Sequence, residues 1–134
     1  METSSREAAV AAAVEEFDRG AFLAELAELV AVPTESQDPD RLPEQARYLE
    51  VQMRPRLEAL GYACVVLDNP VAGAGPFLFA ERTEDAALPT VLTYGHGDVI
   101  RGQESRWRAG LDPWTLSVED DKVYGRGTAD NKGQ

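Results

Sequence analysis

An apolar segment that ends in a His-x-Asp pair spans residues 90–98 and has the sequence TVLTYGHGD. Its first five residues predict a β-strand, because they are β-branched, aromatic or aliphatic. Residues i and i+2 of extended backbone point to the same side, so the side chains of His96 and Asp98 should converge. Open α/β sheets bind ligands at such strand ends. A metal-binding His also needs an acceptor for its second ring nitrogen, which Asp98 would supply.

A second motif follows about thirty residues later, where residues 125–130 read GRGTAD. Two glycines beside Arg126 permit unusual backbone angles and close approach. The carboxylate of Asp130 ends this tight turn, where it can ligate one metal ion or bridge two. Simpler interpretations stay open for both motifs. His96 can be a surface residue in a Gly turn, and Asp130 can cap a helix that begins at Asn131.

The rest of the chain predicts helices first and strands afterwards. Residues 4–30 favour a helix that opens with a Ser4-x-x-Glu7 capping box and breaks at Arg19-Gly20. Residues 44–60 favour a second helix, in which Pro55 marks a kink or a register change. Strands are expected at residues 62–67, 77–82 and 90–94, and a hairpin at 116–118 with 122–124. This order predicts an α/β fold.

Charge and composition exclude several classes of partner. The 134 residues carry a net charge of −11, which argues against nucleic acid and anionic membrane surfaces as partners. No apolar run approaches the ~20 residues of a membrane helix, and the N-terminus lacks the pattern of a signal peptide. Cys64 is the single cysteine, so a reducing compartment fits. We therefore expect a cytoplasmic protein that binds neither membranes nor nucleic acid.

The two motifs together, with Trp107 and Asp112-Pro113-Trp114 between them, resemble a family of dinuclear zinc hydrolases. That family includes acetylornithine deacetylase, succinyl-diaminopimelate desuccinylase, carnosinase-type dipeptidases and carboxypeptidase G. The segment 29–34 is similar to an early segment of the same family. The resemblance implies a three-layer α/β/α zinc-exopeptidase-like domain, with two N-terminal helices and then a mixed sheet. Residues 1–134 would be its truncated N-terminal part, without the lid and dimerisation domain and the C-terminal half.

The resemblance also implies roles for three residues. His96 matches a terminal zinc ligand, Asp98 the active-site carboxylate that orients this His, and Asp130 the carboxylate that bridges both metal ions. The implied cofactors are two divalent ions, zinc first, with cobalt or manganese as alternatives. The implied substrate is a small N-acyl amino acid or dipeptide-like amide, and the implied parent enzyme is a homodimer. A cis peptide is expected after Asp130.

The chain offers fewer metal ligands than the family's dinuclear site needs. Two zinc ions each need about four ligands, whereas the chain offers His96 and Asp130 and contains no second His. By the resemblance, the general base, a further acidic ligand and a second His lie downstream of Asp130. We therefore expect metal binding by His96 and Asp130 that is weak or undetectable, and no catalysis by the 134-residue chain alone.

Two other functions remain open beside this one. A related co-catalytic zinc aminopeptidase uses a similar His-x-Asp and Asp-Asn turn. A non-catalytic docking module is the alternative from another class, and its uncovered strand edges would need a partner. Departures from the family pattern occur at Gly97 and Asn131. Arg126 and Lys132 are expected to have structural roles. Arg126 would pair with a nearby carboxylate and hold the Gly turn, and Lys132 would face solvent or a neighbouring acid.

Overall fold

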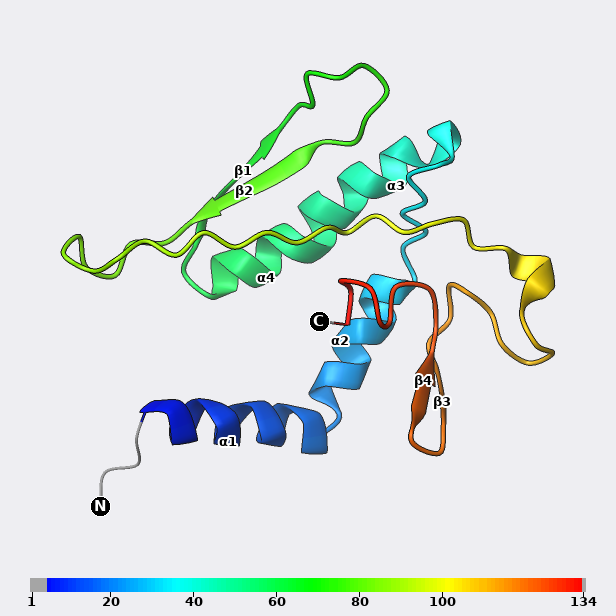
Figure 1. Ribbon diagram of the computed structural model, residues 1–134, viewed down its shortest axis with the longest axis horizontal. Helices are drawn as coiled ribbons and strands as arrows, with labels where there is room; N and C mark the ends of the chain where they lie inside the picture. The colour runs from blue at the N-terminus through cyan, green and yellow to red at the C-terminus, as the bar shows by residue number, and fades with distance from the viewer. Residues whose placement is uncertain (1–4, 134) are drawn as a thin grey trace.

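Two consecutive helices begin the computed structural model, which describes residues 5–133. Helix α1 (Ser5–Asp18) ends where Gly20 takes a left-handed φ of 78°, and α2 (Ala21–Val30) follows at a new angle (Figure 1). The expected break at Arg19-Gly20 is thus confirmed. Ser4, and with it the expected capping box, lies outside the described residues. Helix α2 buries an apolar stripe, whereas α1 has no buried residue in its described span.

The second helical segment changes register in its middle. A π-helical turn, η2, separates two short α-helices and coincides with the approach to Pro55, which lies in the first turn of α4. Proline has no N–H and its ring crowds the preceding turn, so the ladder shifts there. The predicted register change is therefore confirmed. The elements are η1 (Pro39–Arg41), α3 (Leu42–Arg47), η2 (Tyr48–Met53) and α4 (Arg54–Ala59).

The strands of the described residues form two separate antiparallel hairpins. Strand β1 (Ala63–Leu67) pairs with β2 (Phe77–Glu81), and β3 (Ser117–Glu119) pairs with β4 (Lys122–Tyr124). The expectation of one mixed sheet is therefore wrong for residues 5–133. The expected strand at 90–94 joins no ladder among the described residues. A short 3₁₀ turn, η3 (Glu104–Arg106), follows it.

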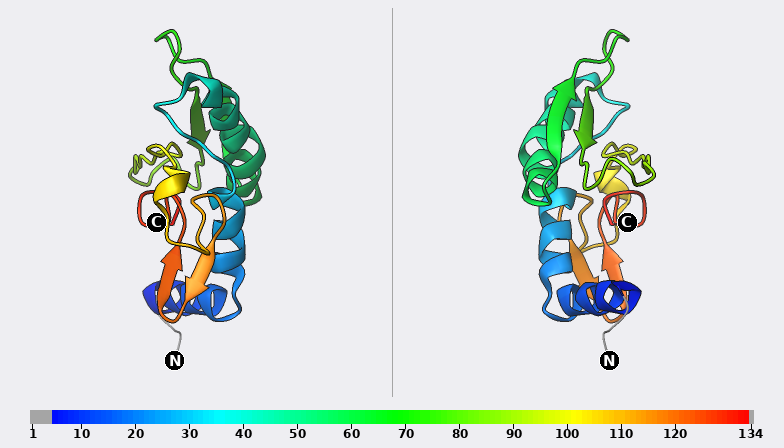
Figure 2. Two further views of the ribbon diagram at one scale, coloured as in Figure 1. Left: turned by 90° about the vertical axis from the view of Figure 1, so that its right-hand side faces the viewer. Right: turned by 90° about the vertical axis from the view of Figure 1, so that its left-hand side faces the viewer.

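The molecule is extended and its core is small. Figure 2 shows α1 at one end and the β1–β2 hairpin at the other. A compact monomer of 14.6 kDa exposes about 6,900 Å², whereas this chain exposes 9726 Å². The buried apolar residues gather where α2 meets the segments that flank the two sequence motifs: Leu26, Val30, Val32, Tyr48 and Val99. The core therefore lies directly beneath the candidate site.

One face of the β1–β2 hairpin is apolar and uncovered. Its outward side chains include Val65 and Phe79, which lie opposite each other across the ladder and are about half exposed. In the extended segment that follows, Leu92 and Tyr94 are 89% and 88% exposed. Contiguous apolar surface of this kind marks an interaction surface. No helix among residues 5–133 is both long and apolar enough to cross a membrane.

Candidate metal centre

The backbone around the His-x-Asp pair is hydrogen-bonded to residues 34–36, which follow α2. The N–H of Val99 donates to the carbonyl of Thr34 at 2.9 Å, and the N–H of Ser36 donates to the carbonyl of Val99 at 3.1 Å. The buried hydroxyl of Thr34 donates to the carbonyl of Gly97 at 2.5 Å. These three bonds fix the backbone on both sides of Asp98.

The space beside Gly97 is filled by an aromatic ring. A Cβ atom on Gly97 would lie 2.2 Å from Cε1 of Tyr48 and 2.5 Å from its Cδ1. Tyr48 is only 4% exposed, and burial raises the pKa of its phenol. The glycine departure from the family pattern therefore has a structural reason in this chain.

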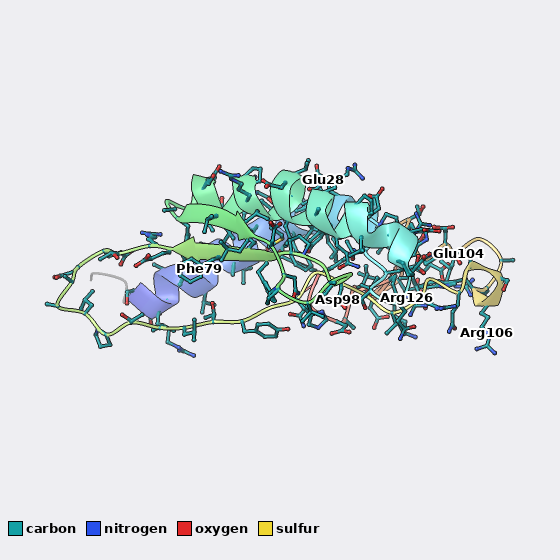
Figure 3. The ribbon with its side chains drawn as sticks, turned by 90° about the horizontal axis from the view of Figure 1, so that it is seen from above. Glu28, Phe79, Asp98, Glu104, Arg106 and Arg126 are labelled. Carbon is teal, nitrogen blue, oxygen red and sulfur yellow. The ribbon has the colours of Figure 1, made fainter. Side chains whose placement is uncertain are left out.

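The imidazole of His96 lies between two carboxylates. Its Nδ1 is 3.2 Å from Oδ1 of Asp98 and 3.0 Å from the backbone carbonyl oxygen of the same residue. Its Nε2 is 3.2 Å from Oδ1 of Asp130. Figure 3 shows Asp98 beside the C-terminal turn. The three residues expected from the sequence to form the site are thus brought together.

The arrangement around His96 suits a cation between Nε2 and Asp130. Nδ1 faces only acceptors of Asp98, which favours the tautomer that carries its proton on Nδ1 and has its Nε2 lone pair directed towards Asp130. Two acceptors that face each other attract a proton or a metal ion into the gap. Ligands about 2.1 Å from a zinc ion at the tetrahedral angle lie ~3.4 Å apart, close to the observed 3.2 Å.

The donor set is small, however. Within residues 5–133, no group of three or more His, Cys, Asp or Glu side chains is placed to hold one metal ion. His96 and Asp130 are the pair aimed at the gap, and the Asp130 side chain is 69% exposed. A hollow of about 250 Å³ opens beside it, with Ile100, Arg126 and Ala129 among its lining residues. Space for further ligands therefore lies on the solvent side of Asp130.

The turn that carries Asp130 is anchored by a buried lysine. Lys132 is 5% exposed, and its Nζ donates to the carbonyls of Leu29 at 3.0 Å and Val32 at 2.8 Å. Nζ also lies 5.1 Å from the centre of the Tyr48 ring. Burial lowers the pKa of Lys132 to about 8. The expectation that Lys132 faces solvent or an acid is wrong, because the carbonyls at the end of α2 attract its ammonium.

Arg126 holds the loop between the two motifs. Its Nη2 donates to the carbonyl of Gly102 at 2.7 Å, and its guanidinium lies 5.4 Å from the ring centre of Trp107. Trp107 donates to the same carbonyl through Nε1 at 2.8 Å. The expected hold on the Gly turn is confirmed, although the hydrogen-bond acceptor is a carbonyl and not a carboxylate.

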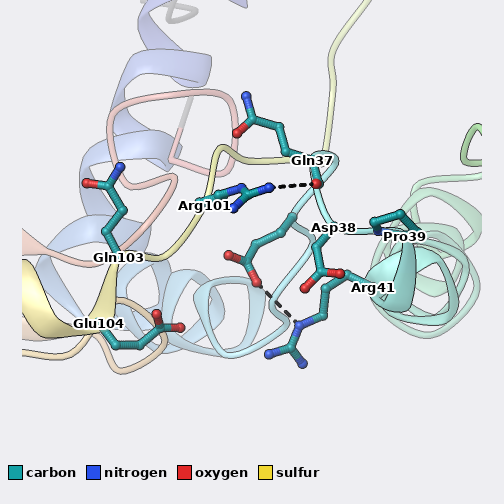
Figure 4. Close-up of a pocket in the computed structure, with 8 residues that line it drawn as sticks. Gln37, Asp38, Pro39, Arg41, Arg101, Gln103 and Glu104 are labelled. Carbon is teal, nitrogen blue, oxygen red and sulfur yellow. Dashed lines mark hydrogen bonds and ion pairs between the residues drawn. The ribbon is translucent and has the colours of Figure 1, made fainter.

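A larger hollow of about 560 Å³ lies away from His96, between the loop before α3 and the loop that begins at Arg101 (Figure 4). Glu35 is buried on its wall, where its carboxylate accepts from the N–H of Gly102 at 2.7 Å and pairs with Nε of Arg41 at 3.3 Å. Arg101 Nη2 lies 3.5 Å from the carbonyl of Gln37. These contacts join the two loops.

Asn131 contacts the backbone of His96, a role that the sequence did not predict for it. Residues 5–133 contain no cis peptide bond, so the expected cis bond after Asp130 is not present; Asn131 instead has a left-handed φ of 62°. Its Oδ1 accepts from the backbone N–H of His96 at 2.9 Å. Asparagine directly after a Gly-rich turn is the signal that was available, since Asn adopts this backbone region readily.

The segment that carries the site is similar to a known protein family. Residues 92–134 match Peptidase family M20/M25/M40, a range that begins just before His96 and includes Asp130. This segment of the chain is similar to the M20/M25/M40 peptidases. The match covers the C-terminal third of the chain, which contains all three expected site residues.

Two curated proteins are similar to most of the chain. The Beta-Ala-His dipeptidase of Mus musculus is 34% identical over 122 residues, which is 84% of this chain and 24% of the relative. The acetylornithine deacetylase of Pasteurella multocida is 32% identical over 112 residues, 84% of this chain and 28% of the relative. The chain therefore spans about a quarter of the length of these curated relatives.

A solved structure shows the same fold. The dipeptidase Dug1p from Saccharomyces cerevisiae superposes with a TM-score of 0.71 and 22% identity over 86% of this chain and 26% of its own. Most of the mixed helix and strand architecture of this chain is therefore that of part of the Dug1p fold.

Proposed function

We propose that this chain carries part of the active site of a metal-dependent hydrolase that cleaves the amide bond of a small N-acyl amino acid or dipeptide. The observation that carries the proposal is the imidazole of His96, held between the carboxylates of Asp98 and Asp130 with 3.2 Å to each. Support comes from the family match over the same residues and from relatives named as dipeptidase and deacetylase.

Each of the three residues has a distinct role in this proposal. His96 binds a divalent ion through Nε2. Asp98 accepts the Nδ1 proton, which fixes the tautomer and the orientation of the ring. Asp130 offers two oxygens on an exposed carboxylate, one beside His96 and one free to reach a second ion. When bound, two divalent ions, zinc by preference, would supply Lewis-acid chemistry for activating water and polarising the scissile carbonyl.

The same contacts define what the chain lacks. A zinc ion takes about four ligands, and the described residues direct one imidazole and one carboxylate at the gap. We propose that ions bind weakly to this chain and that the remaining ligands and the general base belong to a different part of a longer protein, which also carries the lid and the dimer contact. The chain alone should then not hydrolyse amides, although the parent enzyme should, in the cytoplasm.

A zinc titration tests this proposal directly. The chain has a single His, so the ring protons of His96 give unique NMR signals. We expect Zn²⁺ to shift them, and Asp130→Asn to weaken the response strongly. Asp120→Asn is the matched control, since Asp120 is an exposed turn residue of the β3–β4 hairpin. The proposal fails if Zn²⁺ leaves the ring signals unchanged at millimolar concentration, or if Asp130→Asn behaves like the control.

The docking module remains the second candidate, because a specific observation favours it. The uncovered apolar face around Val65, Phe79 and Leu92 needs a protein surface against it. Concentration-dependent association of the chain, without zinc binding at His96, would favour this function over the hydrolase. A zinc aminopeptidase would be distinguished by the parent enzyme's requirement for a free N-terminal amine.

A further inference from the structure

Two residues outside the three expected site residues contact the backbone of the His-x-Asp segment, and one of them also reaches Asp130. Thr34 holds the carbonyl of Gly97, as described above. Asn131 contacts both sides of the gap. Its Oδ1 accepts from the N–H of His96 at 2.9 Å, and its Nδ2 lies 3.5 Å from Oδ1 of Asp130. The Asp130 oxygen is the same one that faces Nε2 of His96.

We propose that Asn131 is a positioning residue that sets the separation between His96 and Asp130 through its side-chain amide. This role rests on the proposed function, but the contacts that define it do not involve a metal ion. One planar amide spans the two segments that carry the candidate ligands, although these segments are separated by 34 residues in the sequence. Its length therefore limits how far they can move apart.

The position of Asn131 itself is well determined. The N–H of Asp130 donates to the carbonyl of Gly127 at 3.2 Å, and the N–H of Lys132 donates to the carbonyl of Asp130 at 3.0 Å. Lys132 then fixes the turn to the end of α2 through two carbonyls. The left-handed φ of 62° between these anchors aims the Asn131 side chain at His96.

The extended segment before His96 has little else to hold it. It joins no strand ladder, and a Cβ on Gly95 would lie 3.3 Å from Oδ1 of Asn131, in close contact. Without the amide, the N–H of His96 loses its acceptor, and the segment is restrained only from Gly97 onwards. The backbone that carries the imidazole could then shift relative to Asp130, although Asp98 would still hold the ring.

Hydrogen exchange of the His96 amide tests the role without a metal ion. Asn131→Gly keeps a left-handed backbone and removes the side chain, so the His96 amide should exchange about 10-fold faster, as expected for one lost hydrogen bond. Asn131→Asp keeps an acceptor oxygen and should preserve the slow exchange. Asp120→Gly is the matched control, because Asp120 has a similar φ of 54° on the exposed β3–β4 turn.

Zinc binding supplies the second measurement. Asn131→Gly should weaken the Zn²⁺ response of the His96 ring protons about 10-fold, the size of an outer-sphere effect on a metal site, while its melting temperature stays close to that of Asp120→Gly. The role is overturned if the His96 amide of the unmodified chain is unprotected, or if Asn131→Gly changes neither exchange nor affinity. If Zn²⁺ does not shift the His96 ring signals of the unmodified chain, the proposed function fails. Exchange of the His96 amide still tests the role of Asn131 in that case.

Discussion

Gly97→Ala should destabilise the protein, because the space for a side chain at this position is occupied. The added Cβ would lie 2.2 Å from Cε1 of Tyr48, about 1.2 Å inside ordinary van der Waals contact at 3.4 Å. Tyr48 is 4% exposed and its ring lies under the ammonium of Lys132, so it cannot swing out freely. Overpacking of this kind costs about 1–3 kcal/mol, which urea unfolding followed by circular dichroism would measure.

A double-mutant cycle identifies the cause of this loss. In a Tyr48→Leu background the ring is gone, so adding the methyl group at position 97 should cost less than about 0.5 kcal/mol. The coupling between the two positions would then be at least about 0.5 kcal/mol. The reasoning is refuted if Gly97→Ala is neutral in the unmodified chain, or if it costs the same in both backgrounds.

Three further predictions concern other contacts. Thr34→Val should lower the free energy of unfolding by about 1–2 kcal/mol, since the half-buried carbonyl of Gly97 loses its donor, whereas Thr34→Ser should be close to neutral; chemical denaturation measures both. Glu35→Ala should lower the free energy of unfolding by about 1–3 kcal/mol, because the buried N–H of Gly102 loses its acceptor. Glu58→Ala removes an exposed ion pair with Arg54 and should cost less than about 0.5 kcal/mol. Equal losses would contradict the burial argument. Leu92→Ser should reduce concentration-dependent association in sedimentation experiments without changing stability, because the side chain is 89% exposed.

Local signals in the sequence predicted the elements whose causes are local. The helix break at Gly20 and the register change before Pro55 follow from the backbone preferences of single residues. The strands at 62–67 and 77–82 and the hairpin at 116–118 with 122–124 follow from apolar residues around turn formers, although the pairing of β1 with β2 was not predicted. The segment 90–94 has an equally good strand composition, but it forms no ladder among the described residues because pairing depends on a distant neighbour.

The contacts of the candidate site also fall into local ones, which the sequence predicted, and distant ones, which it did not. The approach of His96 to Asp98 follows from i, i+2 spacing, which is a local rule. The approach of Asp130 did not follow from any spacing and came only with the family resemblance. The burial of Lys132 was missed, because its acceptors lie about a hundred residues away in the chain at Leu29 and Val32.

The most direct test of the central claim is the position of a bound metal ion. Crystals of the chain grown with Zn²⁺ would show an anomalous scattering peak at the zinc edge. The account predicts a peak about 2.1 Å from both Nε2 of His96 and an oxygen of Asp130, with Nδ1 still facing Asp98. A zinc ion bound elsewhere, with Nε2 of His96 still in direct contact with the Asp130 carboxylate, would contradict it.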